Sequence, residues 1–319
     1  YKTHLLLLHL DICILIVIFI LVLSVLCGYV SLCERKILAI VQFRIGPALF
    51  LFGLLTPITD GVKLFVKFTL FVIGVDSILF ISSLFITAFC IFFPWFFFPL
   101  GFIIIFDKGF TLLFLLGFHL FSNVFCIFFV GCFLFSSCFI YLAAMRTLFF
   151  SILSECSILI LLYCIYILDY FCFFGIKDIC ISQLSLQNCF ILGLLFICLF
   201  WIGLLLDGLR LPFDYLECES ELVAGLVTEL SGIFFVIYSV LEINHLLLTT
   251  ILFSCLCFGG LFICFKSILI LILGFLIPRV ICCRLKITTA QTFILLFLFT
   301  MGFINFSFIA ITKIICILF

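Results

Sequence analysis

Long apolar runs separated by short charged segments dominate this chain. A helix needs about 20 mostly apolar residues to cross about 30 Å of hydrocarbon. We expect eight membrane spans, at residues 5–32, 70–93, 110–135, 141–168, 189–206, 230–258, 261–277 and 288–311. Hydropathy alone leaves seven and nine spans as alternatives. The pattern predicts an all-α polytopic membrane protein that forms a single membrane domain over residues 1–319.

Two polar segments interrupt the apolar runs. Residues 33–68 carry clustered charges and the helix breakers Pro47 and Pro57, and residues 59–67 favour a short helix lying in the membrane interface. Residues 207–229 form an acidic loop. Most basic residues fall on the side of the membrane that holds both segments. The positive-inside rule assigns that side to the cytoplasm or, in an organelle, to the matrix, and both termini to the opposite side.

Composition agrees with a membrane location. Hydrophobic residues make up 68% of the 319 residues and charged residues 9%, too few for a soluble protein to cover its surface. The formal net charge of zero gives no reason to expect nucleic-acid binding. The 20 cysteines form no Cys-x-x-Cys pair, so we interpret them as small apolar residues and expect no metal site. The interchange of Phe, Leu, Ile and Cys across the spans suggests an organelle gene with a strong compositional bias.

Ionisable side chains inside apolar runs are the first candidates for chemistry. Glu155 and Glu242 both lie within predicted spans. A charge at membrane depth costs several kcal/mol unless it is paired, protonated or hydrated. Such a position favours a proton relay or an ion site, although a structural ion pair meets the same condition.

The acidic loop is the second candidate. Its carboxylates are Asp207, Asp214, Glu217, Glu219, Glu221 and Glu229. In a helix, Glu217 would share a face with Asp214 and with Glu221, and like charges this close resist ionising together. These groups would therefore share protons and respond to a nearby change of charge. A solvated acidic loop is the alternative, but apolar residues alternate with the charges.

Three segments carry the remaining sequence signal: residues 34–47, which begin Glu34-Arg35-Lys36, residues 53–67, which contain Asp60, and residues 207–225 of the acidic loop. Together they resemble the chain 1 family of proton-pumping NADH:ubiquinone oxidoreductase, respiratory complex I. Arg146 and Glu155 match the family pattern at the start of span four. The resemblance covers roughly residues 20–290.

Several positions depart from the family pattern. Asp207 stands where the family usually has Glu, which shortens the side chain but keeps the charge. Ala48 replaces the usual Asn, and Phe68 the usual Glu. In the basic loop at residues 278–286, only Pro278 and Arg279 retain the family pattern.

The resemblance implies that ubiquinone is the substrate and enters from the bilayer, in a mitochondrial inner membrane. The implied quinone-chamber residues are Glu34, Arg35, Arg44, Asp60, Arg210, Phe213 and Arg279. The implied proton relay consists of Asp207, Asp214, Glu217, Glu219, Glu221, Glu155, Glu229 and Glu242. Iron–sulfur clusters and flavin would belong to partner subunits, namely the peripheral quinone-site subunits, with small membrane subunits as further neighbours.

The sequence is also compatible with two other functions. A membrane subunit of an energy-converting hydrogenase would share the fold but not the quinone. A secondary transporter, from another class, would also place carboxylates at the membrane midplane, but such transporters often show an inverted repeat, and none is evident in this sequence.

Overall fold

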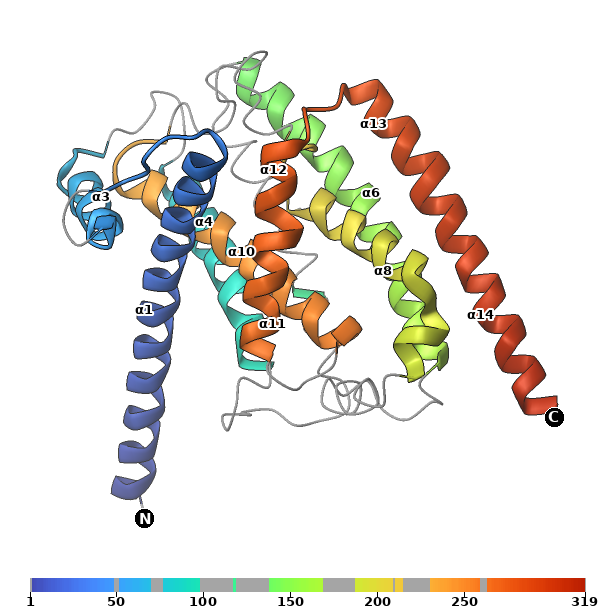
Figure 1. The fold of residues 1–319 in the computed structure, drawn as a ribbon. Helices are drawn as coiled ribbons and strands as arrows, with labels where there is room; N and C mark the ends of the chain where they lie inside the picture. Colours follow the sequence, from blue (N-terminus) through green and yellow to red (C-terminus); the bar gives the residue numbers. More distant parts are fainter. Residues whose placement is uncertain are drawn as a thin grey trace. The chain divides into compact units, whose positions relative to one another are not determined.

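The structure is a computed structural model that describes residues 2–48, 52–69, 77–97, 117–118, 138–168, 187–208, 210–214, 230–258 and 263–318. Every regular element in these ranges is helical (Figure 1), which confirms the all-α class. The chain groups into two compact units. Unit 1 holds Tyr1–Leu70 and Ser231–Asn244, and unit 2 holds Phe71–Leu230 and His245–Phe319. That the chain forms one membrane domain stays a prediction.

Unit 1 contains α1 (Lys2–Val41), α3 (Thr56–Val66) and the first part of α10 (Ile233–Phe258). Helix α1 continues well beyond the predicted end of span one, so Glu34, Arg35 and Lys36 lie on a helix rather than in a loop. It ends where Phe43 adopts a left-handed conformation (φ 52°) and the N–H of Arg44 donates to the carbonyl of Ala39 at 2.9 Å. This turn satisfies a carbonyl that the helix end would otherwise leave open.

The connection between α1 and α3 depends on Gly53. This residue has φ +88°, and an added Cβ would run into the carbonyl of Pro47. Only glycine adopts this backbone conformation at little steric cost. Gly53 therefore fixes how the chain enters α3, which begins with Pro57 in its first turn.

Unit 2 contains most of the helices. They are α4 (Ser77–Phe92), the 3-10 turn η1 (Phe93–Phe97), α6 (Cys138–Leu168), α8 (Gln187–Asp207), the second part of α10, α11 (Ile263–Ile270), the π-helix η4 (Leu271–Leu276), α12 (Ile277–Ile281), α13 (Ile287–Phe293), the π-helix η5 (Ile294–Phe299) and α14 (Thr300–Leu318). Helix α6 packs against both α8 and α14 (Figure 1).

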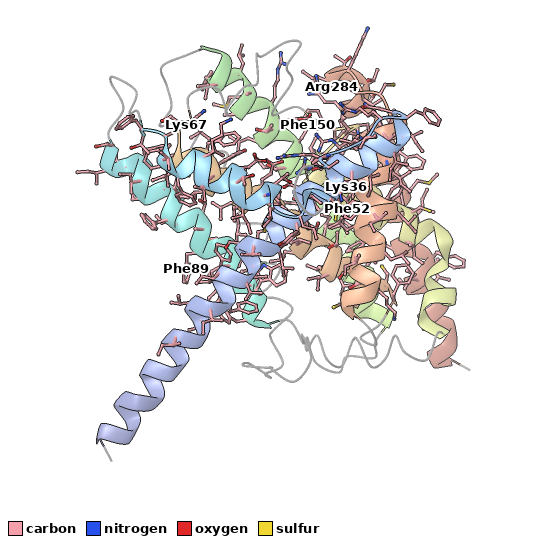
Figure 2. The ribbon with its side chains drawn as sticks, turned by 60° about the vertical axis from the view of Figure 1, so that its left-hand side comes forward. Lys36, Phe52, Lys67, Phe89, Phe150 and Arg284 are labelled. Carbon is pink, nitrogen blue, oxygen red and sulfur yellow. The ribbon has the colours of Figure 1, made fainter. Side chains whose placement is uncertain are left out.

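Aromatic side chains divide between the interior and the outer surface of unit 2. Phe150 on α6 and Phe200 on α8 are fully buried, and the Phe200 ring stacks on that of Phe253 with centroids 5.6 Å apart. Phe89 on α4 is exposed instead (Figure 2). An outward-facing Phe in a long apolar helix is expected where the surrounding medium is lipid.

The predicted seventh span is helical but irregular. Its helix passes from α11 into the π-helix η4, where Gly274 lies close to Trp201 of α8. The indole Nε1 of Trp201 donates a hydrogen bond to the carbonyl of Gly274 at 3.1 Å. A side chain at position 274 would meet the indole, because its Cβ would lie 2.8 Å from Nε1.

Within the described residues, five helices are long and apolar enough to cross a membrane. They are Ile16–Val41, Ser77–Phe96, Ile140–Ile160, Ile233–Phe258 and Ile287–Ile311. A shorter apolar helix, Ile197–Asp207, lies in the predicted fifth span. The predicted third span, residues 110–135, falls outside the described residues except at 117–118. The number eight therefore stays a prediction.

Candidate functional site

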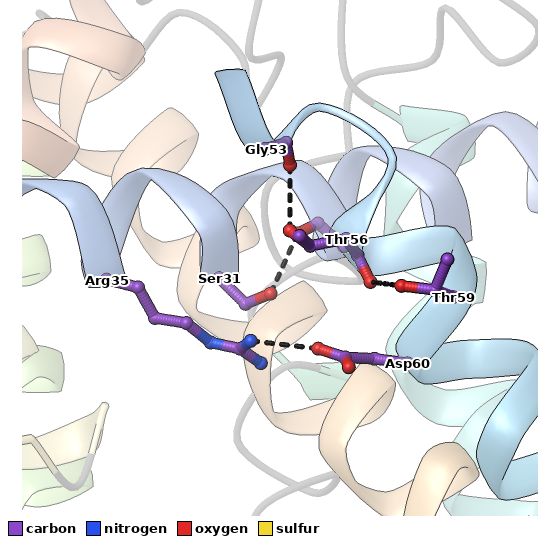
Figure 3. A network of polar contacts seen from close by, with 7 residues as sticks. Ser31, Arg35, Gly53, Thr56, Thr59 and Asp60 are labelled. Carbon is purple, nitrogen blue, oxygen red and sulfur yellow. Dashed lines mark hydrogen bonds and ion pairs between the residues drawn. The ribbon is translucent and has the colours of Figure 1, made fainter. Parts of the chain in front are cut away.

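Arg35 and Asp60 form an ion pair between α1 and α3 in unit 1. Nη1 of Arg35 lies 2.8 Å from Oδ2 of Asp60 (Figure 3). Their side chains are 54% and 48% exposed, so both remain accessible. A guanidinium has five N–H donors, and one contact to a carboxylate leaves others able to bind a further acceptor.

Short hydrogen bonds order the backbone beside this pair. The hydroxyl of Thr56 donates to the carbonyl of Gly53 at 2.7 Å, and that of Thr59 donates to the carbonyl of Thr56 at 2.9 Å (Figure 3). The first bond ties the first turn of α3 to the preceding loop, and the second lies within that turn. Asp60 is one residue further along, so this local order positions its carboxylate opposite Arg35.

The structure also describes the other predicted site residues of unit 1, which are not members of the Arg35–Asp60 pair. Glu34 is half-buried on α1, and Arg44 is exposed just beyond the end of α1. Glu242 is half-buried on α10. The structure thus joins Arg35 to Asp60, and a chamber that includes Glu34 and Arg44 stays a prediction.

Unit 2 contains a set of ionisable groups, the Asp207 cluster, made of half-buried Glu155 and the buried Asp207 and His245. They come from α6, the end of α8 and α10. Oδ2 of Asp207 lies 3.8 Å from Nε2 of His245, with side chains 0% and 7% exposed. The charge of Asp207 also acts on Glu155. A single proton on this cluster would therefore change the interactions of all three groups.

The position of Asp207 makes an ionised carboxylate costly. It is the last residue of α8, where the helix macrodipole already supplies partial negative charge. Burial removes the water that would stabilise the anion. His245 is therefore the kind of partner that Asp207 needs, because an imidazole can carry a positive charge when the carboxyl is ionised.

Glu155 adds a second unusual feature to the cluster. Its Oε1 atom is buried and has no hydrogen-bond partner among the described residues. Buried polar atoms are nearly always hydrogen-bonded to protein or to ordered water. Oε1 of Glu155 is therefore open to a bound water molecule, and a role in proton exchange stays a prediction.

The start of the acidic loop docks on the basic loop. The Phe213 side chain is buried, with its ring 6.4 Å from that of Phe293 on α13. Oδ2 of Asp214 lies 3.3 Å from Nη2 of Arg284, and the N–H of Leu285 donates to the carbonyl of Pro212 at 3.2 Å. Arg210 and Arg279 are half-buried. Aromatic packing and an ion pair thus fix residues 210–214 to residues 284–293 within unit 2.

The structure does not describe four of the predicted proton-relay residues. Glu217, Glu219, Glu221 and Glu229 lie outside the described residues. Among the residues that the structure does describe, no three His, Cys, Asp or Glu side chains gather as metal ligands. Of the predicted quinone-chamber residues, unit 1 contains Glu34, Arg35, Arg44 and Asp60, and unit 2 contains Arg210, Phe213 and Arg279.

Sequence reasoning missed His245 and Arg284 as site residues. His245 lies inside an apolar span, so the rule that singled out Glu155 and Glu242 applies to it as well. Arg284 lies in the basic loop, on the same predicted side as Asp214. That shared side was a signal, but it could not indicate which of several basic residues makes the contact.

Comparison with known proteins shows the family. A family model described as NADH dehydrogenase matches residues 13–310. The chain is 65% identical to NADH-ubiquinone oxidoreductase chain 1 of Leishmania tarentolae over 98% of this chain and 100% of that protein. It is 33% identical to the protein of the same name from Chondrus crispus, over 77% of this chain and 74% of the relative. It is 31% identical to a subunit of NADH-quinone oxidoreductase from Paramagnetospirillum magneticum, over 73% and 67%. The chain therefore belongs to the NADH dehydrogenase family, in agreement with the three segments that first indicated it.

Proposed function

We propose that this chain is the core membrane subunit of a proton-pumping NADH:ubiquinone oxidoreductase that forms the access chamber for ubiquinone. The observation that carries the proposal is the Arg35–Asp60 contact. It joins two of the three segments that resemble the family, in a chain that matches a relative named NADH-ubiquinone oxidoreductase chain 1 over that relative's full length.

In this proposal the chain crosses the mitochondrial inner membrane eight times and is encoded in the organelle. Helix α3 is the interfacial helix between spans one and two. It has 11 residues, too few to span a bilayer, and none of them is fully buried. Its exposed apolar side chains, such as Phe65 and Val66, suit contact with lipid or with a neighbouring protein of the complex.

Arg35 would recognise a carbonyl oxygen of the quinone. The guanidinium stays charged in poorly hydrated surroundings and has donors beyond the one facing Asp60. Asp60 would hold the guanidinium in place and balance its charge while the chamber is empty. Glu34, Arg44, Arg210, Phe213 and Arg279 would complete the walls.

Reduction of the quinone would be linked to proton movement through carboxylates. A change of charge in the chamber alters which nearby acids bind protons, and the acidic loop would pass that change to the Asp207 cluster. Asp207, Asp214 and Glu155 supply described members of this path. Glu217, Glu219, Glu221, Glu229 and Glu242 would extend it.

Electrons would reach the quinone from partner subunits that hold flavin and iron–sulfur clusters. The acidic and basic loops would dock those peripheral subunits, and small membrane subunits would cover part of the remaining surface. The names of the relatives all refer to an NADH oxidoreductase with a quinone acceptor. These names favour the proposal over a component of a hydrogenase or a secondary transporter.

Replacing Arg35 tests the chamber. In the assembled enzyme, we expect Arg35→Gln to raise the KM for ubiquinone about 10-fold or more, because a hydrogen bond to a charged group contributes about 1.5–3 kcal/mol. NADH oxidation by an artificial acceptor that bypasses the quinone should be unchanged. Lys36→Gln, which removes the adjacent cation from the same helix end, is the matched control. Unchanged quinone kinetics in Arg35→Gln would contradict the chamber role.

Replacing Glu155 tests the proton link. Glu155→Gln keeps the size of the side chain but removes its acid, so proton pumping per NADH oxidised should fall. Ser151→Ala is the control one turn earlier on α6, where the hydroxyl donates only to the local carbonyl of Leu148. The relay role is wrong if quinone reduction and pumping both remain intact in Glu155→Gln.

A further inference from the structure

His245 is the one ionisable residue of the Asp207 cluster that the acidic relay described above does not use. It lies on α10, inside the apolar helix Ile233–Phe258, and is nearly fully buried. Its Nε2 atom points to Oδ2 of Asp207 at 3.8 Å. A buried histidine facing a buried carboxyl at a helix end is an arrangement that can hold a proton on either member.

The energetics favour sharing over a fixed charge. An ionised Asp207 alone would lose its hydration and meet the negative end of the α8 dipole. An imidazolium alone would be equally poorly solvated. The pair can instead be neutral, as carboxyl and imidazole, or ionic, as carboxylate and imidazolium, and its total charge is the same in both forms. Interconversion therefore moves charge inside the protein without changing the total charge that is buried.

We propose that His245 is a proton-holding residue that exchanges one proton with Asp207. In the forward step the O–H bond at Oδ2 of Asp207 breaks as an N–H bond forms at Nε2 of His245. No electron is transferred, and the reverse step restores the starting pair. Direct transfer needs a heavy-atom distance of about 2.6–3.2 Å, so a side-chain rotation must shorten the present separation.

The geometry gives this exchange a consequence for Glu155. Asp207 already acts electrostatically on Glu155, whose Oε1 is buried without a partner among the described residues. When the proton is on His245, Asp207 is a carboxylate, and when the proton is back on Asp207, that negative charge is gone. His245 therefore controls the charge that acts on Glu155, and this inference rests on the proposed role of Glu155 and Asp207 in proton movement.

A double-mutant cycle in the assembled enzyme tests the proposal. The variants are His245→Gln, Asp207→Asn and the two combined, and the readout is protons pumped per NADH oxidised by ubiquinone in sealed vesicles. Each single variant should lower pumping about 10-fold or more, because a positioned proton-transfer group typically contributes about 100-fold or more. The double variant should be no worse than either single one, because both remove the same two-site unit.

Thr249→Val is the matched control. Thr249 lies four residues after His245 on the same helix face, is fully buried, and donates its hydroxyl to the local carbonyl of Leu246 at 2.7 Å. We expect pumping per NADH to be unchanged in this variant. Infrared difference spectra supply a second readout: the carboxyl band that disappears in Asp207→Asn should shift in His245→Gln and stay in place in Thr249→Val.

The outcomes separate this inference from the proposed function. If Asp207→Asn abolishes pumping while His245→Gln pumps normally and leaves the carboxyl band unmoved, the inference is overturned and the relay stands. If the losses in the two single variants multiply in the double variant, the residues act independently and the inference is again overturned. If neither Asp207→Asn nor Glu155→Gln affects pumping, the proposed relay itself fails.

Discussion

Two acid–base pairs among the described residues lie in opposite environments. Arg35 and Asp60 are in close contact and about half exposed, whereas Asp207 and His245 lie further apart and are almost completely buried. Exposed pairs typically contribute about 0–1 kcal/mol to stability. Breaking a buried pair by removing one partner costs about 3–5 kcal/mol, because a charge is left uncompensated.

This difference in burial indicates which kind of pair suits ligand binding and which suits proton exchange. A group that must meet an incoming ligand has to remain accessible, and it cannot contribute much to folding for the same reason. A group that exchanges protons inside the membrane has to be buried, and it then depends on its neighbours for stability. Substitutions around the Arg35–Asp60 pair should therefore alter kinetics more than stability, whereas substitutions in the interior of unit 2 should alter stability strongly.

The largest loss of stability is expected from Phe213→Ala in unit 2. Phe213 is 3% exposed and packs against Phe293, and truncating a buried Phe costs about 3–5 kcal/mol. The yield of assembled enzyme on native gels and its Tm should both fall. Phe308→Ala, at a 60% exposed position on α14, should lose much less. Equal Tm values for the two variants would show that the acidic loop is not anchored by Phe213.

Gly53→Ala should have the next largest effect, and it tests unit 1. A non-glycine residue in the left-handed conformation costs about 1–2 kcal/mol, and the new Cβ would also overlap the Pro47 carbonyl. We expect a lower Tm and a raised KM for quinone, because Asp60 follows this turn. Gly61→Ala, with open space around its Cβ inside α3, should be neutral or slightly stabilising. A KM for quinone equal to that of the wild type in Gly53→Ala would show that this turn does not position the Arg35–Asp60 pair.

Breaking the half-buried pair of Asp214 and Arg284 should have an intermediate effect. The side chains are 17% and 30% exposed and 3.3 Å apart, so we expect about 1 kcal/mol, between exposed and buried pairs. Arg284→Gln, Asp214→Asn and the double variant form a cycle that thermal unfolding of the assembled enzyme can follow. Strictly additive losses would mean that the two charges do not interact.

Arg35→Lys should have the smallest effect on stability. It keeps the charge but loses the planar arrangement of donors, and the exposed pair contributes no more than about 1 kcal/mol. The Tm should be close to that of the wild type, while the KM for quinone rises. A large drop in Tm without a change in the KM for quinone would show that the Arg35–Asp60 pair stabilises the fold rather than binding the quinone.

The helical class was predictable because apolar runs of membrane length allow few other folds. Span ends were less predictable. We predicted that the first span ends before the charges that begin with Glu34. However, Glu, Arg and Lys are good helix formers, and α1 continues through Val41. Hydropathy indicates which residues face lipid, whereas backbone hydrogen bonds determine at which residue the helix ends.

The site was predictable in part. Arg35 and Asp60 lie in separate motifs that the structure brings together, and their role in a quinone chamber stays a prediction. The partners of Asp207 and Asp214 were not predicted, because His245 and Arg284 are distant in sequence and only the packing of α10 and of the basic loop brings them near. Pattern reasoning identifies residues that need a partner, and tertiary structure decides which residue that partner is.

The uninterrupted course of α1 has a mechanical consequence. Its segment Ile16–Val41 has 26 residues, which at about 1.5 Å per residue makes a rod about 39 Å long. Arg35 is attached near one end of this rod without an intervening hinge. In the proposed chamber, a ligand that drew the guanidinium toward itself would therefore act on a stiff helix rather than on a flexible loop.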